Sequence, residues 1–205
     1  MAIDVETKDC TQLGDAELAE MADLCADAPS RFEVGVLSKA AEAWVLVTLA
    51  REAGKLKGFS FSTLERIGGT PSVLIGLASI KRTGKRQETL KAMMSDQLRR
   101  AVLAFPDEDV LIGTRFVDAS GFDAFTAFMK LQDVTPRPDH KPSGEDRAWG
   151  RRLAKRFGAE AEYDERAFIA KGDGNPACVL DHESAKADKI SADVKALFKG
   201  VNAAE

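Results

Sequence analysis

The sequence predicts an α+β fold, a mixed, mostly antiparallel sheet with helices on both faces and an additional C-terminal helix. An almost unbroken apolar run at residues 73–80 leads through a basic turn into a long amphipathic helix that extends to Phe105. Two further strand-like runs precede this unit, at residues 44–50 and 58–67, and short turn sequences separate all three. Such closely spaced strands favour an antiparallel meander, and the strand and helix patterns after the long helix extend the sheet.

The N-terminal part is expected to add a strand and two helices. Alternating side chains predict a short first strand over residues 3–7. Residues 15–25 place their apolar side chains on one stripe, which is typical of a helix packed on a core, and Asp15 can cap this helix. Residues 31–42 predict a loop that ends in a short helix.

The three strands of the meander differ in pattern. Residues 44–50 are continuously apolar, as expected for a strand that is buried on both faces. Residues 58–67 alternate phenylalanine with serine, so one face of this strand is expected to be more exposed. The sequence GGTP at residues 68–71 is a strong turn signal, and it leads directly into the strand at residues 73–80.

The turn at residues 81–86, KRTGKR, holds four cations in six residues. Apolar side chains recur at three- to four-residue spacing in the helix that follows it: Leu90, Met93, Met94, Leu98, Ala101, Val102 and Phe105. Unpaired backbone N–H groups and the helix dipole favour an anion at a helix N-terminus, so this loop is a candidate phosphate site. The alternative is a solvated, positively charged turn, and the local sequence leaves both interpretations open.

The second half of the chain continues the alternation of strands and helices. Residues 110–117 predict a fifth strand, and a helix with phenylalanines on one side follows Asp118. Residues 135–144 contain three prolines and are expected to form a loop. Residues 145–157 predict a helix whose arginines and lysines form a solvated face, or alternatively a contact with a partner or RNA. Residues 159–171 predict two final strands.

The C-terminus is expected to form an amphipathic helix. Its apolar stripe consists of Ala187, Ile190, Val194, Leu197 and Phe198. This helix is expected to dock on the body of the protein or on a second subunit, which provides a route to a homodimer. We therefore expect one domain over residues 1–175, with an inserted loop and helix at about 133–157, and a helical tail over residues 176–205.

The composition narrows the classes of function. The chain of 205 residues has a net charge of −4 and a pI near 5.4, which argues against a dedicated nucleic-acid binder. No apolar run reaches the roughly 18 residues of a membrane-spanning helix, and the N-terminus lacks the apolar core of a signal peptide. Three scattered cysteines, Cys10, Cys25 and Cys178, are typical of thiols in a reducing cytoplasm. Two distant histidines without paired cysteines argue against a structural zinc site.

Two common catalytic motifs do not fit the chain. A nucleotide-binding loop of the pattern G-x-x-x-x-G-K-[ST] would end at Gly84 and Lys85. It requires glycine at position 79 and a hydroxyl residue at position 86, where this chain has Ser79 and Arg86. The G-x-S-x-G nucleophile motif of hydrolases is absent from the sequence.

The order of the predicted elements resembles that of the GNAT superfamily of acyl-CoA-dependent N-acetyltransferases. In that family the loop typically reads R/Q-x-x-G-x-G/A, its amides hold the pyrophosphate of coenzyme A, and the following helix usually carries a pair of leucines. When Met93 and Met94 are laid on this pair, Lys85 falls on the arginine of the family and Arg86 lies next to it. The resemblance covers the order of elements over residues 3–170.

A second GNAT pattern, N-x-x-A-x-x-x-Y-x-K-x-G-F, opens the next helix of the family. The residues that fall on it in register are Gly121, Ala124, Phe128, Lys130, Gln132 and Asp133. The chain departs from the family at several of these positions. Glu88 and Leu90 stand where the loop has small residues, and Phe128 replaces the tyrosine that is the frequent general acid. Gln132 and Asp133 replace the closing glycine–aromatic pair.

The resemblance implies a fold that binds acetyl-CoA, without a metal. Loop amides and side chains would hold the phosphates, namely those of Arg82, Gly84, Lys85, Arg86 and Gln87. The backbone of Ser79, Ile80 and Lys81 would face the pantetheine arm. The acetyl group would pass to the amine of a small molecule or peptide.

Transfer to an ammonium group needs a base, directly or through water. The candidates are two carboxylates at expected strand ends, Glu65 and Asp118, although Asp118 can instead cap the next helix. Tyr163 is the only tyrosine of the chain, so a phenol acid would have to be this residue. The alternative function is a GNAT fold whose catalytic site has decayed, leaving a binding or regulatory module.

Overall fold

The computed structural model describes residues 2–28, 31–129, 134–171, 180–181, 190–199 and 201. These residues belong to two compact units. The first consists of Met1–Arg115 together with Cys178–His182, and the second of Phe116–Ala177 together with Glu183–Glu205. The expected domain boundary near residue 175 stays a prediction.

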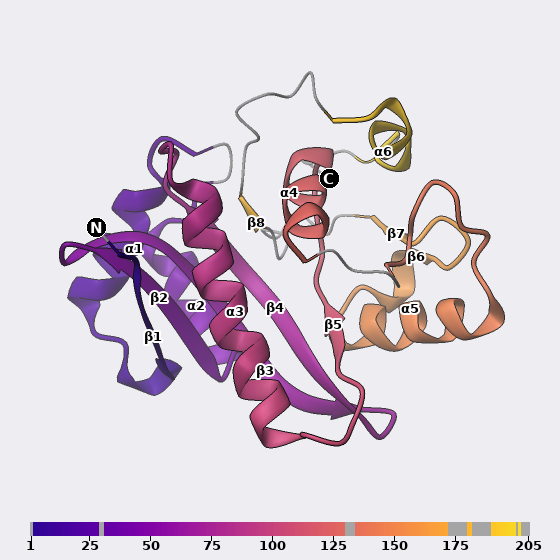
Figure 1. The fold of residues 1–205 in the computed structure, drawn as a ribbon, viewed down its shortest axis with the longest axis horizontal. Helices are drawn as coiled ribbons and strands as arrows, with labels where there is room; N and C mark the ends of the chain where they lie inside the picture. The colour runs from indigo at the N-terminus through magenta and orange to yellow at the C-terminus, as the bar shows by residue number, and fades with distance from the viewer. Residues whose placement is uncertain are drawn as a thin grey trace. The chain divides into compact units, whose positions relative to one another are not determined.

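The first unit is built around one mixed sheet (Figure 1). Its strands lie in the order β1-β2-β3-β4-β5, with the bounds Asp4–Asp9, Leu46–Glu52, Lys55–Ile67, Thr70–Ile80 and Leu111–Gly113. The pairs from β1 to β4 are antiparallel, whereas β4 and β5 are parallel. A short strand β8, Leu180–Asp181, also pairs with β4 in parallel. The predicted meander and the mixed, mostly antiparallel sheet are therefore confirmed.

Helices cover both faces of this sheet, as predicted. The helices α1 (Asp15–Cys25) and α2 (Val34–Ala43) pack on one face, and α3 (Arg86–Ala104) crosses the other (Figure 1). On the α1–α2 face, phenylalanines Phe59 and Phe61 are fully buried in one apolar cluster with side chains of both helices. A one-turn 3-10 helix, Cys10–Gln12, connects β1 to this layer.

The α3 face of the sheet is polar at its centre. Gln97 of α3 is buried, and its Nε2 atom lies 3.1 Å from the Ser60 hydroxyl and 3.3 Å from the Thr48 hydroxyl. Thr48 also shares a hydrogen bond of 2.8 Å with Thr7 of β1, whose hydroxyl donates to Asp96 of α3. The expectation that the serine face of β3 is more exposed is therefore wrong: Ser60 and Ser62 are both buried, and Gln97 of α3 binds the Ser60 hydroxyl.

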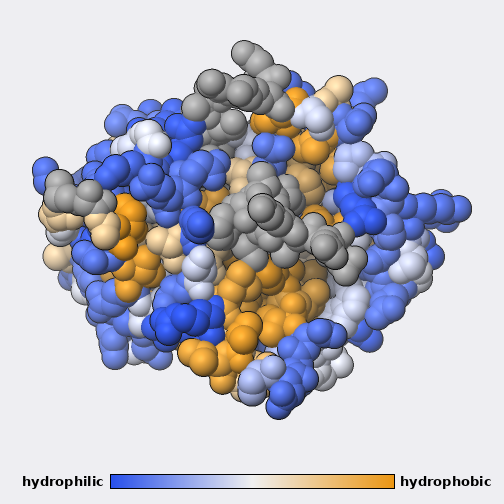
Figure 2. Space-filling view, viewed as in Figure 1, coloured by the Kyte–Doolittle hydropathy of each residue, from blue (hydrophilic) through white to orange (hydrophobic). Residues whose placement is uncertain are grey.

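Helix α3 lies close to the sheet at its N-terminal half. A Cβ atom placed on Gly58 of β3 would lie 2.9 Å from Sδ of Met93 and 3.0 Å from Cγ2 of Thr89. The buried stripe of α3 differs from the predicted one, because Gln97 belongs to it while Val102 is 55% exposed. Figure 2 shows apolar surface at the C-terminal end of α3, where Val102 and Leu103 are exposed.

A β-bulge divides β4 into two halves. Opposite β3, Ser60 pairs with Ala78 but Ser62 pairs with Ile75, so β4 has one extra residue between these pairs. Gly76 lies in this bulge, and a Cβ atom on it would lie 2.3 Å from Cε2 of the Trp44 indole. The absence of a side chain at Gly76 is thus what lets Trp44 pack against the bulge.

Three predicted boundaries need correction. Gly14, rather than Asp15, is the N-cap of α1, and Asp15 begins the helix. Trp44 is the C-cap of α2 rather than the start of a strand, and β2 begins at Leu46. The fifth strand spans three residues instead of eight, because the chain leaves the edge of β4 after Gly113.

The second unit consists of short elements. Its helices are α4, α5 and α6, with the bounds Ala119–Met129, Gly144–Arg156 and Ala192–Leu197. The two strands predicted within residues 159–171 are present as β6 (Tyr163–Asp164) and β7 (Ile169–Ala170), which follow a 3-10 turn at Glu160–Glu162 and pair only with each other in the described chain. The tail helix packs on α4 through Phe198 and Phe122, whose ring centroids are 5.8 Å apart. Ala187, the first residue of its predicted stripe, lies outside the described residues.

Candidate functional site

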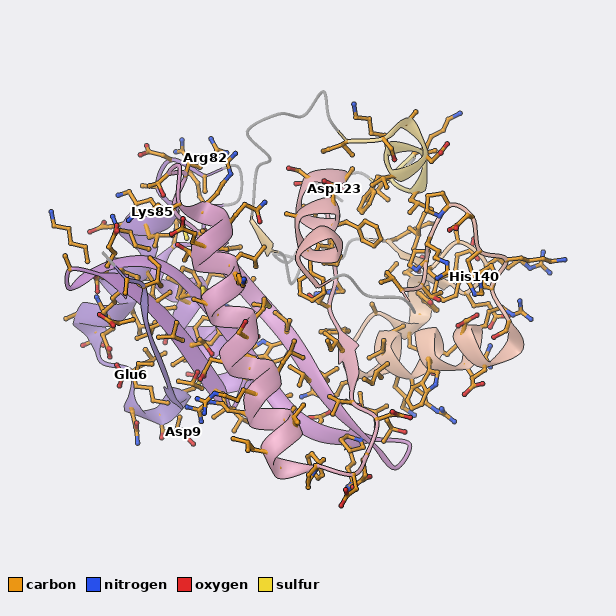
Figure 3. The ribbon with its side chains drawn as sticks, viewed as in Figure 1. Glu6, Asp9, Arg82, Lys85, Asp123 and His140 are labelled. Atoms are coloured by element: carbon orange, nitrogen blue, oxygen red, sulfur yellow. The ribbon has the colours of Figure 1, made fainter. Side chains whose placement is uncertain are left out.

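The candidate site is the basic loop between β4 and α3. Lys81, Arg82, Gly84 and Gln87 are exposed, and Lys85 and Arg86 are partly buried. The Lys81 N–H still bonds to the carbonyl of Lys57, 2.8 Å away, so the loop leaves the sheet only after this residue. Figure 3 shows Arg82 and Lys85 together at the N-terminal end of α3. The structure thus gathers the residues of the predicted phosphate site at one edge of the sheet.

A tight turn centred on Thr83 starts helix α3. The N–H of Lys85 donates to the Thr83 hydroxyl at 3.3 Å, and the N–H of Arg86 donates to the Thr83 carbonyl at 3.2 Å. Lys85 is the N-cap, and its own side chain makes no capping hydrogen bond. Because the positive end of the helix dipole disfavours cations, Lys85 and Arg86 are not there to stabilise α3.

The structure shows how much space the loop has at Gly84 and at Glu88 and Leu90, the two positions where the GNAT pattern has small residues. A Cβ atom on Gly84 would meet nothing within 4 Å among the described residues, so the loop backbone is open there. Leu90 is fully buried against the sheet and does not crowd the loop. Glu88 is exposed in the first turn of α3, where its carboxylate suits the dipole but would repel a phosphate.

Glu52, at the end of β2, is a site residue that the sequence analysis missed. Its Oε1 atom accepts a hydrogen bond from Nζ of Lys85 at 2.5 Å, and its Oε2 atom lies 3.7 Å from Nζ of Lys57. The hydrogen bond to Lys85 lowers the pKa of Glu52, and the same bond raises the pKa of Lys85. One cation of the loop, Lys85, is therefore already paired with a carboxylate of the protein.

The edge of β4 leading to this loop changes partner at the bulge. Strand β5 pairs with Ser72 to Leu74, and the Thr114 hydroxyl then donates to the Ile75 carbonyl at 3.2 Å. Beyond the bulge, Ala78 and Ser79 pair instead with β8. The predicted pantetheine-facing residues, Ser79 to Lys81, thus begin where β8 lies (Figure 1).

Of the three candidate catalytic residues, Glu65 shares a unit with the basic loop and lies at the far end of the β3–β4 hairpin from it. Glu65 pairs with Ser72, which is seven residues from Ser79 along β4, or about 23 Å at the usual rise of a strand. Asp118 and Tyr163 belong to the second unit. Tyr163 packs on Gly150 of α5, and burial raises the pKa of its phenol to about 12. Their catalytic roles stay predictions.

Asp118 has a local structural role that can be separated from catalysis. Its Oδ1 atom accepts a hydrogen bond of 2.9 Å from the N–H of Gly121, in the first turn of α4. We expect Asp118→Ala to lower the free energy of unfolding by about 1 kcal/mol. Asp118→Asn should lower it much less, because asparagine also caps helices. Thermal melts would measure this difference. If Asp118→Asn abolishes a measured transferase activity while it preserves the melting temperature, Asp118 is more than a cap.

Two kinds of feature are absent from the described residues. No group of three or more histidine, cysteine, aspartate or glutamate side chains among the described residues is placed to hold a metal ion. None of the helices in that part of the chain is long and apolar enough to cross a membrane.

Comparison with known proteins gives structural neighbours only. No protein-family model and no curated protein sequence matches this chain. Among solved structures, it is similar to a ribosomal-protein-alanine N-acetyltransferase from Brucella melitensis biovar Abortus 2308, with 15% identity and a TM-score of 0.47 over 69% of this chain and 99% of the other.

Two other neighbours are equally distant in sequence. An aminoglycoside acetyltransferase from an uncultured soil metagenomic sample, in complex with sisomicin, has 14% identity and a TM-score of 0.45 over 69% of this chain and 97% of its own. The NatC complex bound to Gag peptide and CoA has 13% identity and a TM-score of 0.43 over 62% of this chain and 83% of the other. At these identities and TM-scores, the likeness carries no argument about the activity of this chain.

Proposed function

We propose that this protein binds acetyl-CoA at the loop between β4 and α3 and transfers the acetyl group to an amine. One observation carries the proposal. A loop with four cations, at residues 81–86, opens α3 at the point where β4 has passed a bulge and lost its β5 neighbour. Such a junction offers phosphate-binding cations beside a strand edge that can hydrogen-bond an extended ligand.

The side chains of the loop would hold the phosphates more than its amides. Arg82, Lys85 and Arg86 can each donate charge-assisted hydrogen bonds to phosphate oxygens. The backbone at Gly84 is open to approach, whereas the exposed carboxylate of Glu88 disfavours a pyrophosphate placed directly over the first turn of α3. We therefore place the pyrophosphate nearer to the cations of the loop than to the axis of the helix.

The reaction under this proposal is an acyl transfer with a tetrahedral intermediate. The neutral amine attacks the thioester carbonyl carbon, a C–N bond forms, the C–S bond breaks, and coenzyme A leaves as a thiolate that takes up a proton. A base must first remove a proton from the ammonium form of the acceptor. Glu65 and Asp118 stay the candidate bases and Tyr163 the candidate acid. The acceptor is the amine of a small molecule or peptide, in the cytoplasm.

Isothermal titration of the native protein with acetyl-CoA tests the binding step. The expected result is saturable heat at one site per chain, with weaker binding of dephospho or pantetheine fragments that lack the charged groups. No heat at high ligand concentration would refute the proposal. Thiol release with a panel of amines and peptides then measures turnover.

A second function, a binding or regulatory module, is favoured by a specific observation. Lys85 is paired with Glu52, and β8 occupies the edge of β4 beside the loop, so protein groups fill positions that a cofactor would need. Binding of acetyl-CoA without turnover across the whole acceptor panel would favour this module over the enzyme.

Glu52 should weaken anion binding by competing for Lys85. We expect Glu52→Gln to raise the affinity for acetyl-CoA about three- to tenfold, because it leaves the charge of Lys85 for the phosphates. The measurement is the same titration at low ionic strength. Glu42→Gln, at an exposed position of α2 on the other face of the sheet from α3, removes an equal charge and should leave the affinity unchanged. Equal effects of both substitutions would show that only the total charge matters.

A further inference from the structure

We propose that strand β8 is an internal competitor of acetyl-CoA, which must leave the edge of β4 before the pantetheine arm can bind there. This inference rests on the proposed function and adds a form of regulation to the same site. It is based on the pairing of β8 with the two residues of β4 that come directly before Ile80 and the basic loop.

Only one edge of this half of β4 can accept a ligand. On its other side, β3 pairs with Ala78, Ser79 and Ile80 along the whole stretch. Strand β5 ends at Gly113, opposite Leu74, and does not reach past the bulge. A strand presents one row of N–H and C=O groups at each edge, so β8 and an extended ligand cannot both pair with Ala78 and Ser79.

The bulge explains why this edge is available at all. The extra residue of β4 at the bulge, where Trp44 packs against Gly76, separates the half that pairs with β5 from the half that pairs with β8. Strands β5 and β8 thus pair with separate parts of β4. Removing β8 leaves the three pairs between β4 and β5 intact.

Strand β8 is short enough to be displaced. It consists of Leu180 and Asp181, and its register with β4 comprises two residue pairs. Each backbone hydrogen bond adds little net stability, and a two-residue strand has few of them. If β8 exchanges between a paired and an unpaired state, the apparent affinity for acetyl-CoA is the intrinsic affinity multiplied by the unpaired fraction.

An opening variant tests this competition. Proline cannot donate a backbone hydrogen bond, so Leu180→Pro should weaken the pairing with β4. We expect it to bind acetyl-CoA roughly tenfold more tightly than the native chain, in an isothermal titration. The matched control is Ala192→Pro, which places a proline at the first position of α6, where helices accept it. This control should bind like the native chain.

A locked variant tests the opposite direction. Ala78 and Leu180 are paired, and neighbouring strands lie close enough for a disulfide between cysteines at paired positions. In a Cys178→Ser background, Ala78→Cys/Leu180→Cys should lose acetyl-CoA binding at least tenfold when oxidised and regain it when reduced. The oxidised and the reduced states of the same variant are compared, so any effect of the two substitutions on folding is present in both.

The outcomes separate this inference from the function on which it rests. Tighter binding by Leu180→Pro, together with redox-dependent loss in the locked variant, supports it. Equal affinities in all forms would mean that β8 only covers a sheet edge, and acetyl-CoA binding would stand without the competition. Absence of binding in the native, opened and reduced proteins alike would overturn both.

Discussion

Replacing Lys85 and Arg86 together by glutamate is expected to reduce the affinity for acetyl-CoA at least about 100-fold. Both residues lie at the start of α3 in the basic loop, and each can form a charge-assisted hydrogen bond to a phosphate. Loss of two such bonds, at about 1.5–3 kcal/mol each, gives this factor even before the repulsion of the new carboxylates is counted. Isothermal titration at fixed ionic strength measures it.

The control for this double substitution is Lys39→Glu/Arg99→Glu, which changes the net charge equally at two exposed positions of the first unit, one in α2 and one in the C-terminal half of α3. It should reduce the affinity only slightly. Helix α3 should not unfold in the loop variant, because carboxylates at a helix N-terminus are favoured by the dipole. A melting temperature that stays unchanged would therefore assign the loss to binding. A loop variant that binds as well as the native chain would exclude this loop as the phosphate site.

Gly76→Ala is expected to lower the free energy of unfolding of the first unit by about 2–3 kcal/mol. The new Cβ atom would lie 2.3 Å from Cε2 and 2.6 Å from Cζ2 of Trp44, and an indole ring cannot move aside as a flexible chain end can. Either the ring shifts within the apolar layer of α1 and α2, or the bulge straightens and β4 loses its register with β3. Chemical denaturation followed by far-UV circular dichroism measures the loss.

The contact with Trp44 can be isolated by a double-mutant cycle. In a Trp44→Leu background, Gly76→Ala should cost less than about 1 kcal/mol, because the smaller side chain leaves room for the methyl group. Gly84→Ala is a matched control, since a Cβ atom there meets nothing within 4 Å among the described residues. The same cost of Gly76→Ala in both backgrounds would show that the glycine serves the backbone of the bulge rather than the packing of Trp44.

Much of the first unit follows from local patterns in the sequence. The helix over Asp15–Cys25 is predicted correctly apart from its N-cap, because its apolar stripe defines it locally. The exposure of β3 was predicted wrongly for a non-local reason. Both serines are buried, and Ser60 binds Gln97, a polar residue on the sheet-facing side of α3, so no pattern within β3 contains that information.

The site was predicted in part. The basic loop was found from its four cations and its place before a long helix. Glu52 could have been found as well. The first and third strands of an antiparallel meander run in the same direction, so the C-terminal end of β2 lies at the same end of the sheet as that of β4. The pairing of Ser79 with Asp181 could not, since it joins two segments about a hundred residues apart and rests on only two residues of β8.

The polar layer under α3 has a consequence for the strength of ligand binding. Gln97, Thr48, Ser60 and Thr7 tie the helix to three strands, and the helix cannot slide or rotate without breaking several of these bonds together. Near its N-terminus, the close approach to Gly58 also fixes its height above the sheet. The backbone at the start of α3, which carries Lys85 and Arg86, is therefore held in place before any ligand arrives. A phosphate would meet a preorganised site, and little of its binding free energy would be spent on ordering the helix.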